Sequence, residues 1–91
     1  MTSDVLSLIR ENMDGFSKRQ RAIANYIMDN YDKAAFMTAS RLGKTIDVSE
    51  STVVRFAAEL GYDGYPEMQQ ALQEMIRNKL TSIQRIEVSE N

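Results

Sequence analysis

Residues 38–60 read TASRLGKTIDVSESTVVRFAAEL, and this stretch decides the fold. Thr38 is a favourable N-cap for a short helix, and Ser49 is a favourable N-cap for a second helix that ends at Leu60. Only a tight turn, residues 46–48, separates the two helices. Two helices joined by so short a turn cross closely at a large angle, which is the geometry of a helix-turn-helix.

The residues that such a crossing requires stand at the required places. Gly43 supplies a small residue where the second helix crosses the first. The turn favours a residue that tolerates positive φ, and Asp47 is acceptable there but less comfortable than glycine. Apolar residues wedge the angle between the helices from both sides, at Leu42, Ile46, Val48, Val53 and Phe56.

Helix geometry, at about 100° per residue, divides the second helix into two faces. The apolar face holds Val53, Phe56, Ala57 and Leu60. The opposite face holds Ser51 and Arg55, flanked by Thr52, Ala58 and Glu59. An arginine can bind O6 and N7 of guanine together, and a helix of this kind reads the DNA major groove. The pattern therefore favours binding of duplex DNA; the alternative is a helical module that docks a protein partner.

The rest of the chain also shows helical spacing, and no segment alternates long enough for a strand. Ser17 and Gln20 have the spacing of a capping box, and a loop is expected over residues 32–37. We expect five helices, over residues 4–13, 18–31, 39–45, 50–60 and from about 66 to about 83. The predicted fold class is all-α, a five-helix helix-turn-helix DNA-binding domain with a homeodomain-like core.

Composition excludes several other classes of protein. The 91 residues contain no cysteine and no histidine, which removes disulfides, thiolate zinc sites, cysteine nucleophiles and imidazole bases. No acid–base pair or activated nucleophile stands out, so we expect no enzyme activity, no cofactor and no metal. No apolar run approaches the roughly 20 residues of a membrane span, and residues 1–13 do not resemble a signal peptide, so we expect a cytoplasmic protein.

The charge is uneven along the chain. The net charge is −2, from 11 basic and 13 acidic residues, and this acidic total favours the protein-docking alternative. Residues 15–56, however, hold seven basic and four acidic side chains, whereas both ends are acidic. A basic middle segment can present one positive face on an acidic protein, as DNA binding requires.

Two sequence blocks at a characteristic separation carry a family resemblance. Residues 48–56 fit the pattern VSxxTVVRF, and residues 60–67 fit LGYxGYPE. With residues 17–28, which resemble the preceding helix, the chain over residues 5–76 resembles the amino-terminal domain of RpiR-type bacterial transcription regulators. Asp47 departs from the glycine-like residue common in that family's turn, which we expect to lower local stability without changing the fold.

The resemblance implies a DNA-binding domain that works as a dimer and regulates transcription. It also implies a second domain, similar to sugar isomerases, that binds a phosphosugar effector and is missing from this chain. We therefore expect residues 1–80 to form the helix-turn-helix domain, and residues 81–91 to hold the helix end and the start of a linker. The expected function is sequence-specific regulation of sugar or sugar-phosphate metabolism, by a protein of which this chain is the DNA-binding fragment.

Five candidate DNA contacts lie on the second helix of the motif. Ser51 and Arg55 are expected to contact bases, and Ser49 and Thr52 to lie near the phosphates or bases. Glu50 either accepts a hydrogen bond from N4 of cytosine or simply favours the positive end of the helix dipole.

Five further candidates would position the protein on the phosphate backbone. Lys18 and Arg21 share one face with Asn25, and the alternative for that face is simple solvation. Arg41 and Lys44 flank the helix that crosses the backbone in this motif. Thr38 is first an N-cap and only secondarily a phosphate contact.

The first and last helices carry more apolar surface than one small core can cover. The residues are Val5, Leu8, Ile9, Met13, Met68, Leu72, Met75, Ile76, Leu80 and Ile83. We expect part of this surface to be buried in a homodimer, whose paired helices would read half-sites about 34–36 Å apart.

Overall fold

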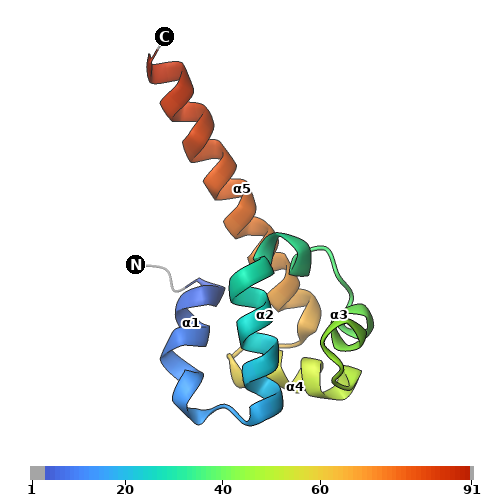
Figure 1. The fold of residues 1–91 in the computed structure, drawn as a ribbon. Helices are drawn as coiled ribbons and strands as arrows, with labels where there is room; N and C mark the ends of the chain where they lie inside the picture. The colour runs from blue at the N-terminus through green and yellow to red at the C-terminus, as the bar shows by residue number, and fades with distance from the viewer. Residues whose placement is uncertain (1–3, 91) are drawn as a thin grey trace.

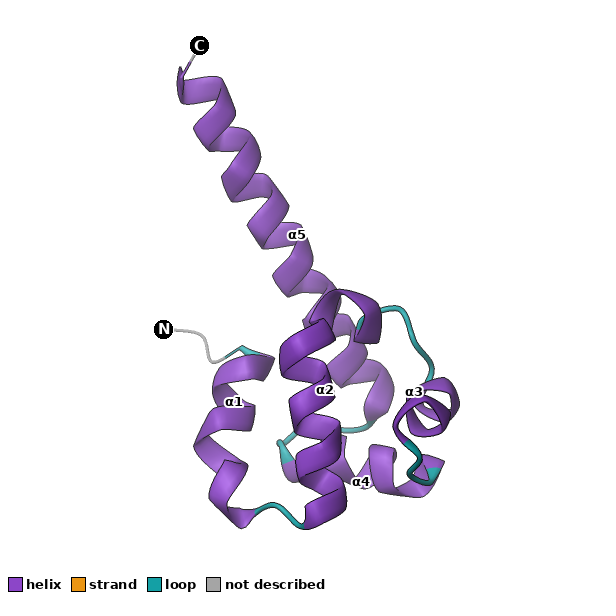
Figure 2. Cartoon of the chain, in the orientation of Figure 1, coloured by secondary structure: helices purple, strands orange, loops and turns teal. Residues whose placement is uncertain are grey.

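The computed structural model describes residues 4–90, and the side chains of residues 4–78. Leu80 and Ile83 of the expected apolar stripe lie outside the described side chains. Short loops join the helices, and residues 4–90 contain no strand (Figure 2). In chain order the elements are α1 (Val5–Asn12), the 3₁₀ turn η1 (Met13–Gly15), α2 (Lys18–Ala34), α3 (Ala39–Ile46), α4 (Glu50–Glu59) and α5 (Tyr65–Glu90). The all-α, five-helix prediction is confirmed.

Local side-chain caps begin the helices as expected. Ser17 and Gln20 form the reciprocal capping box at the start of α2. The Thr38 side chain accepts a hydrogen bond at the start of α3, and Ser49 does so at the start of α4. At the other end of α4, Gly61 adopts a φ of 99°, a left-handed conformation that glycine adopts without strain. These boundaries follow from neighbouring residues, which is why the sequence could locate them.

α2 ends at Ala34, past the expected end near Tyr31, but it is kinked at Asn30, whose φ of −138° and ψ of 40° are not helical. The regular helix is therefore interrupted close to its expected end, and a short helical segment follows the kink. Residues from α5 hold the chain just after this segment: Gln73 Nε2 donates to the Ala35 carbonyl oxygen at 2.9 Å, and the Tyr65 hydroxyl donates to that of Met37 at 2.6 Å. Ala34 and Ala35 are fully buried. The end of α2 and the loop after it therefore pack against residues far along the chain.

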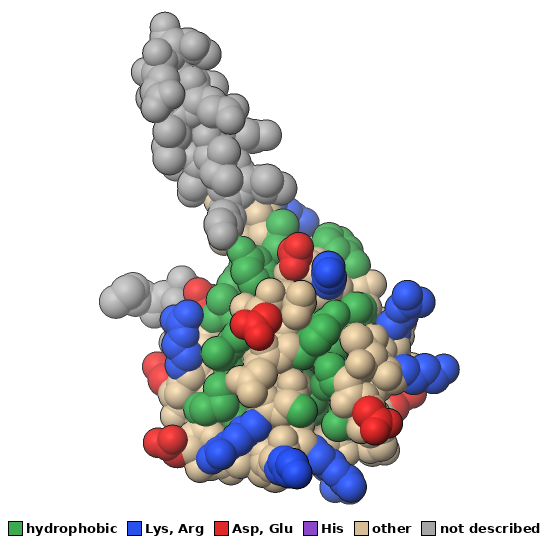
Figure 3. Space-filling view, viewed as in Figure 1, with side chains coloured by type: hydrophobic (Ala, Val, Ile, Leu, Met, Phe, Trp, Pro, Cys, Tyr) green, Lys and Arg blue, Asp and Glu red, His purple; other side chains and the backbone are tan. Residues whose placement is uncertain are grey.

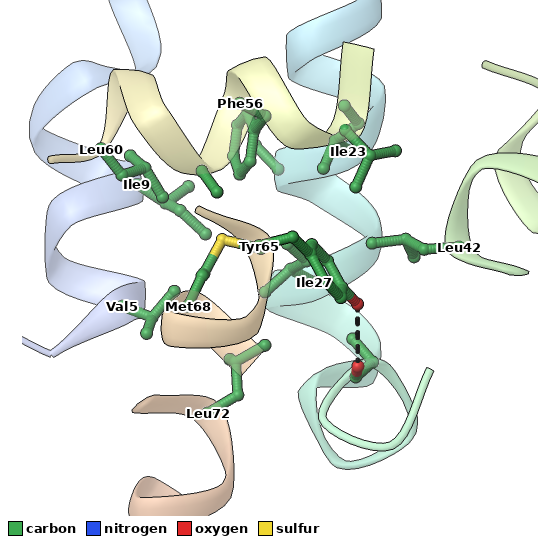
Figure 4. Packing of buried hydrophobic residues seen from close by; sticks show 14 of the residues in the cluster. Val5, Ile9, Ile23, Ile27, Leu42, Phe56, Leu60, Tyr65, Met68 and Leu72 are labelled. Atoms are coloured by element: carbon green, nitrogen blue, oxygen red, sulfur yellow. Dashed lines mark hydrogen bonds between the residues drawn. The ribbon is translucent and has the colours of Figure 1, made fainter. Parts of the chain in front are cut away.

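One core joins all five helices (Figure 4). The largest fully buried side chains are Val5, Ile9, Ile23, Ile27, Leu42, Val53, Phe56, Met68 and Leu72. The rings of Phe16 and Phe56 meet with centroids 5.2 Å apart, and this packing turns the apolar face of α4 inward. The first turns of α5 pack in this core, and Figure 1 shows the later part of α5 projecting away from the body of the molecule. The helix runs to Glu90, whereas the sequence predicted that it frays somewhere after Ile83.

The core divides the apolar residues of the expected dimer surface into two groups. Four of its ten residues, Val5, Ile9, Met68 and Leu72, are fully buried within this chain. Leu8, Met13, Met75 and Ile76 are only partly buried. The monomer core therefore uses part of this apolar surface, and burial of another part in a homodimer stays a prediction.

Candidate nucleic-acid interface

The crossing of α3 and α4 is set by a close approach at Gly43. A β-carbon at this position would lie 2.6 Å from the Val48 carbonyl oxygen, a distance that real β-carbons essentially never show. The Val48 N–H donates to the Gly43 carbonyl oxygen at 2.8 Å. Asp47 closes the turn in the left-handed region, with φ 59° and ψ 47°. Gly43 and Asp47 therefore have the close contact and the positive φ that the sequence predicted for them.

The two faces of α4 are separated as predicted. Val53, Phe56 and Ala57 are fully buried, and Leu60 just after the helix is 6% exposed. Ser51 and Arg55 are exposed on the opposite side. They line a shallow depression together with Glu50 and Val54. The arginine side chain is thus available to a partner, with short polar groups beside it.

Hydroxyl groups at the start of α4 are engaged with each other. Ser49 Oγ accepts a hydrogen bond from the Thr52 N–H at 3.1 Å, and the two side-chain oxygens lie 2.7 Å apart. Ser49 is exposed and Thr52 is half-buried. The exposed Glu50 lies in the first turn, where the helix dipole favours an anion. The dipole interpretation of Glu50 is therefore consistent with its position.

A second shallow depression runs along α3. It is lined by Thr38, Ser40, Arg41, Lys44 and Thr45. Two cations and three hydroxyl groups in one depression suit phosphate oxygens, which accept hydrogen bonds from both kinds of group. Ser40 and Thr45 were not among the predicted contacts, although Thr45 lies one helical turn after Arg41. The Thr45 hydroxyl donates to the Arg41 carbonyl oxygen at 2.8 Å.

The first turns of α2 bring further positive charge towards the same region. Lys18, Arg21 and Asn25 are all exposed. Figure 3 shows basic side chains along the lower and right edges of the molecule, where Figure 1 places the start of α2, α4 and α3. Several basic side chains of residues 15–56 therefore lie near α3 and α4, although Lys33, at the other end of α2, does not.

No metal-binding group of three or more histidine, cysteine, aspartate or glutamate residues occurs in the described part of the chain. No helix among the described residues is long and apolar enough to span a membrane. Burial raises the pKa of Tyr65 to about 12, and burial with the nearby Asp4 and Glu67 carboxylates raises the pKa of Tyr62. Both tyrosines therefore favour the neutral hydroxyl form.

Comparison with known proteins assigns the chain to a family. The model of the helix-turn-helix domain of the RpiR family matches residues 3–79. The chain belongs to the RpiR family. Its RpiR-type fold also matches the structure of the Vibrio vulnificus NanR protein complexed with ManNAc-6P, with a TM-score of 0.78 and 34% identity over 88% of this chain and 31% of that chain.

Curated relatives agree with the RpiR assignment. The uncharacterized HTH-type transcriptional regulator YfhH of Escherichia coli K12 is 32% identical over 78% of this chain and 25% of its own length. The HTH-type transcriptional regulator HexR of Pseudomonas aeruginosa is 34% identical over 71% of this chain and 23% of its own length. The chain thus spans about a quarter of these relatives. The family places it among DNA-binding transcription regulators.

Proposed function

We propose that this chain binds duplex DNA sequence-specifically through the open face of α4. The observation that carries the proposal is the depression in which Arg55 and Ser51 are exposed while the opposite side of α4 is buried. The major groove admits an α-helix, so α4 can enter it with this exposed side towards the bases. Arg55 would bind O6 and N7 of a guanine, and Ser51 would contact an adjacent base edge.

Positive charges and hydroxyl groups around α4 would hold it in register. Arg41, Lys44 and Thr38 would contact phosphates from the depression on α3, together with Ser40 and Thr45. Lys18 and Arg21 would contact phosphates from the first turns of α2. Ser49 and Thr52 would lie near the backbone where α4 enters the groove, and Glu50 would act mainly on the helix dipole. These contacts supply affinity without sequence information.

A homodimer would present two such helices to DNA. Four partly buried side chains of α1, η1 and α5 remain as candidates for its interface: Leu8, Met13, Met75 and Ile76. Two copies would then read half-sites about 34–36 Å apart. Sedimentation at high micromolar concentration tests this directly, because a strict monomer there would contradict it.

The full-length protein would couple this domain to a phosphosugar. In this proposal residues 1–80 form the DNA-binding domain and residues 81–91 lead into a linker and an effector domain; the matched relatives are three to four times longer than the part that this chain covers. NanR was solved with a sugar phosphate, ManNAc-6P. The protein would be a cytoplasmic regulator of sugar or sugar-phosphate metabolism, without enzyme activity of this domain.

Selection of bound duplexes from a random DNA pool tests the proposal, followed by titration of the enriched site at two salt concentrations. Affinity is expected to fall steeply with salt, with a slope on the order of one counterion for each phosphate contact. A protein-docking module would enrich no sequence, and any weak DNA affinity it had would not depend on Arg55. That outcome would favour the protein-docking alternative.

A further inference from the structure

One apolar side chain lies within the predominantly polar open face of α4. Val54 is 40% exposed, and it lines the depression together with Glu50, Ser51 and Arg55. Phe36, which is 71% exposed, is the other large exposed hydrophobic among the described residues, but it lies in the loop before α3. Single exposed apolar residues are common on proteins, so the position of Val54 matters more than its exposure.

Helical spacing makes Val54 a neighbour of the predicted base contacts. It follows Ser51 by three residues and precedes Ala58, also exposed, by four. Val54 and Ala58 therefore form a short apolar edge beside the polar row of Ser51 and Arg55. A helix that presents Arg55 to base edges presents this apolar edge to the next base along the groove.

Only one group in the major groove is apolar, and it is the C5-methyl of thymine. A valine in a helix has one strongly preferred side-chain rotamer, so it loses little conformational freedom when it makes contact. We propose that Val54 is a specificity-determining residue that recognises a thymine methyl group next to the base bound by Arg55. The inference rests on the proposed function, because it requires α4 to lie in the major groove.

The test replaces each thymine of the selected site in turn by deoxyuridine, which differs only in lacking the C5-methyl. The wild-type chain is expected to lose about three- to fivefold in affinity at one thymine per half-site, the effect of burying roughly one methyl group. Val54→Ala should bind the thymine site more weakly by a similar factor and should no longer distinguish thymine from deoxyuridine at that position. Val54→Thr, which keeps one γ-methyl group, should retain part of the discrimination.

Two controls test whether a loss of discrimination in Val54→Ala comes from misfolding or from the loss of any exposed apolar side chain. Val54 is partly exposed and alanine is the better helix former, so thermal unfolding of Val54→Ala should match or exceed that of the wild type. Phe36→Ala removes the other exposed apolar side chain and should leave discrimination of deoxyuridine unchanged.

The outcomes distinguish the two levels of the proposal. If the wild type prefers its selected site and loses that preference in Arg55→Ala, yet no thymine effect disappears in Val54→Ala, only the role of Val54 is overturned. A selected site without a thymine beside the base read by Arg55 overturns it as well. If the wild type shows no sequence preference at all, the proposed function fails, and the role of Val54 fails with it.

Discussion

A backbone hydrogen bond joins Gly43 and Val48 across the turn between α3 and α4. The Val48 N–H donates to the Gly43 carbonyl oxygen at 2.8 Å, and the Val48 carbonyl oxygen occupies the space that a β-carbon at residue 43 would need. This contact sets how closely the two helices cross. It therefore controls the angle at which Arg55 is presented.

Gly43→Ala should destabilise the domain by about 1–3 kcal/mol, because the backbone at Val48 must move, and this outweighs the roughly 1 kcal/mol by which alanine favours a helix. Gly15→Ala is the matched control. Nothing lies within 4 Å of a β-carbon there, so it should be neutral or slightly stabilising. Urea denaturation measures the free energy of unfolding of both variants. An equal change in this free energy for Gly43→Ala and Gly15→Ala would contradict the close contact at Gly43.

Asp47→Gly should stabilise the domain by up to about 1 kcal/mol, because Asp47 holds a left-handed conformation that glycine adopts at no steric cost. Thermal unfolding measures the change. Asp47→Asn removes the same charge but keeps a side chain tolerant of this conformation, so it should change stability little. A comparable gain in thermal stability in Asp47→Gly and Asp47→Asn would mean that loss of the negative charge, not backbone strain, causes the stabilisation.

Arg55→Ala should weaken binding to the selected site by about 1–3 kcal/mol and relax the choice of base at one position of each half-site. The side chain is exposed, so the fold should persist. Titration against the selected site and its single-base variants measures both effects. An unchanged ranking of the variants would remove Arg55 from base recognition.

Lys44→Ala should weaken binding to all duplexes alike and reduce the salt slope by about 1, because it removes one phosphate contact without touching a base. Arg10→Ala makes the same change in net charge on α1, which lies across α2 from α3 (Figure 1). The control should leave the salt slope nearly unchanged. Equal slopes for the two variants would mean that only total charge matters.

Stability should fall at high pH through Tyr65. Burial raises the pKa of Tyr65 to about 12, above the ordinary value of 10.0, so the unfolded chain releases this proton first. The contribution is complete below about pH 9 and is lost as pH rises through about 10 to 12. At about pH 11 the loss is about 1 kcal/mol, and Tyr65→Phe should lack this part. Denaturation of both proteins at about pH 9 and about pH 11 measures the difference, and parallel losses would contradict it.

The features predicted correctly depend on residues close together in the chain. Ser17 caps α2 three residues before its partner Gln20, and Gly43 meets Val48 five residues later. The buried and open faces of α4 follow from the helical period. Val54 was assigned to neither face, although its angular position lies beside Ser51, and its exposure became evident only in the structure.

Two findings required the tertiary structure. The kink of α2 at Asn30 was not predicted, and the chain just after α2 accepts hydrogen bonds from Tyr65 and Gln73, which follow their acceptors by 28 and 38 residues. The apolar residues of α1 and α5 were known, but only their packing shows that Val5 and Leu72 are fully buried in the monomer while Leu8 and Met75 are not.

The amino-acid sequence by itself determined the helix-turn-helix and the chemistry of its open face. Caps, a required glycine and a helical period act over one or two turns, and a linear pattern records them. The three-dimensional packing decided how much apolar surface is left for a partner and which hydroxyl groups join the cations on α3. Burial depends on which distant segments meet, and their meeting is a property of the whole chain.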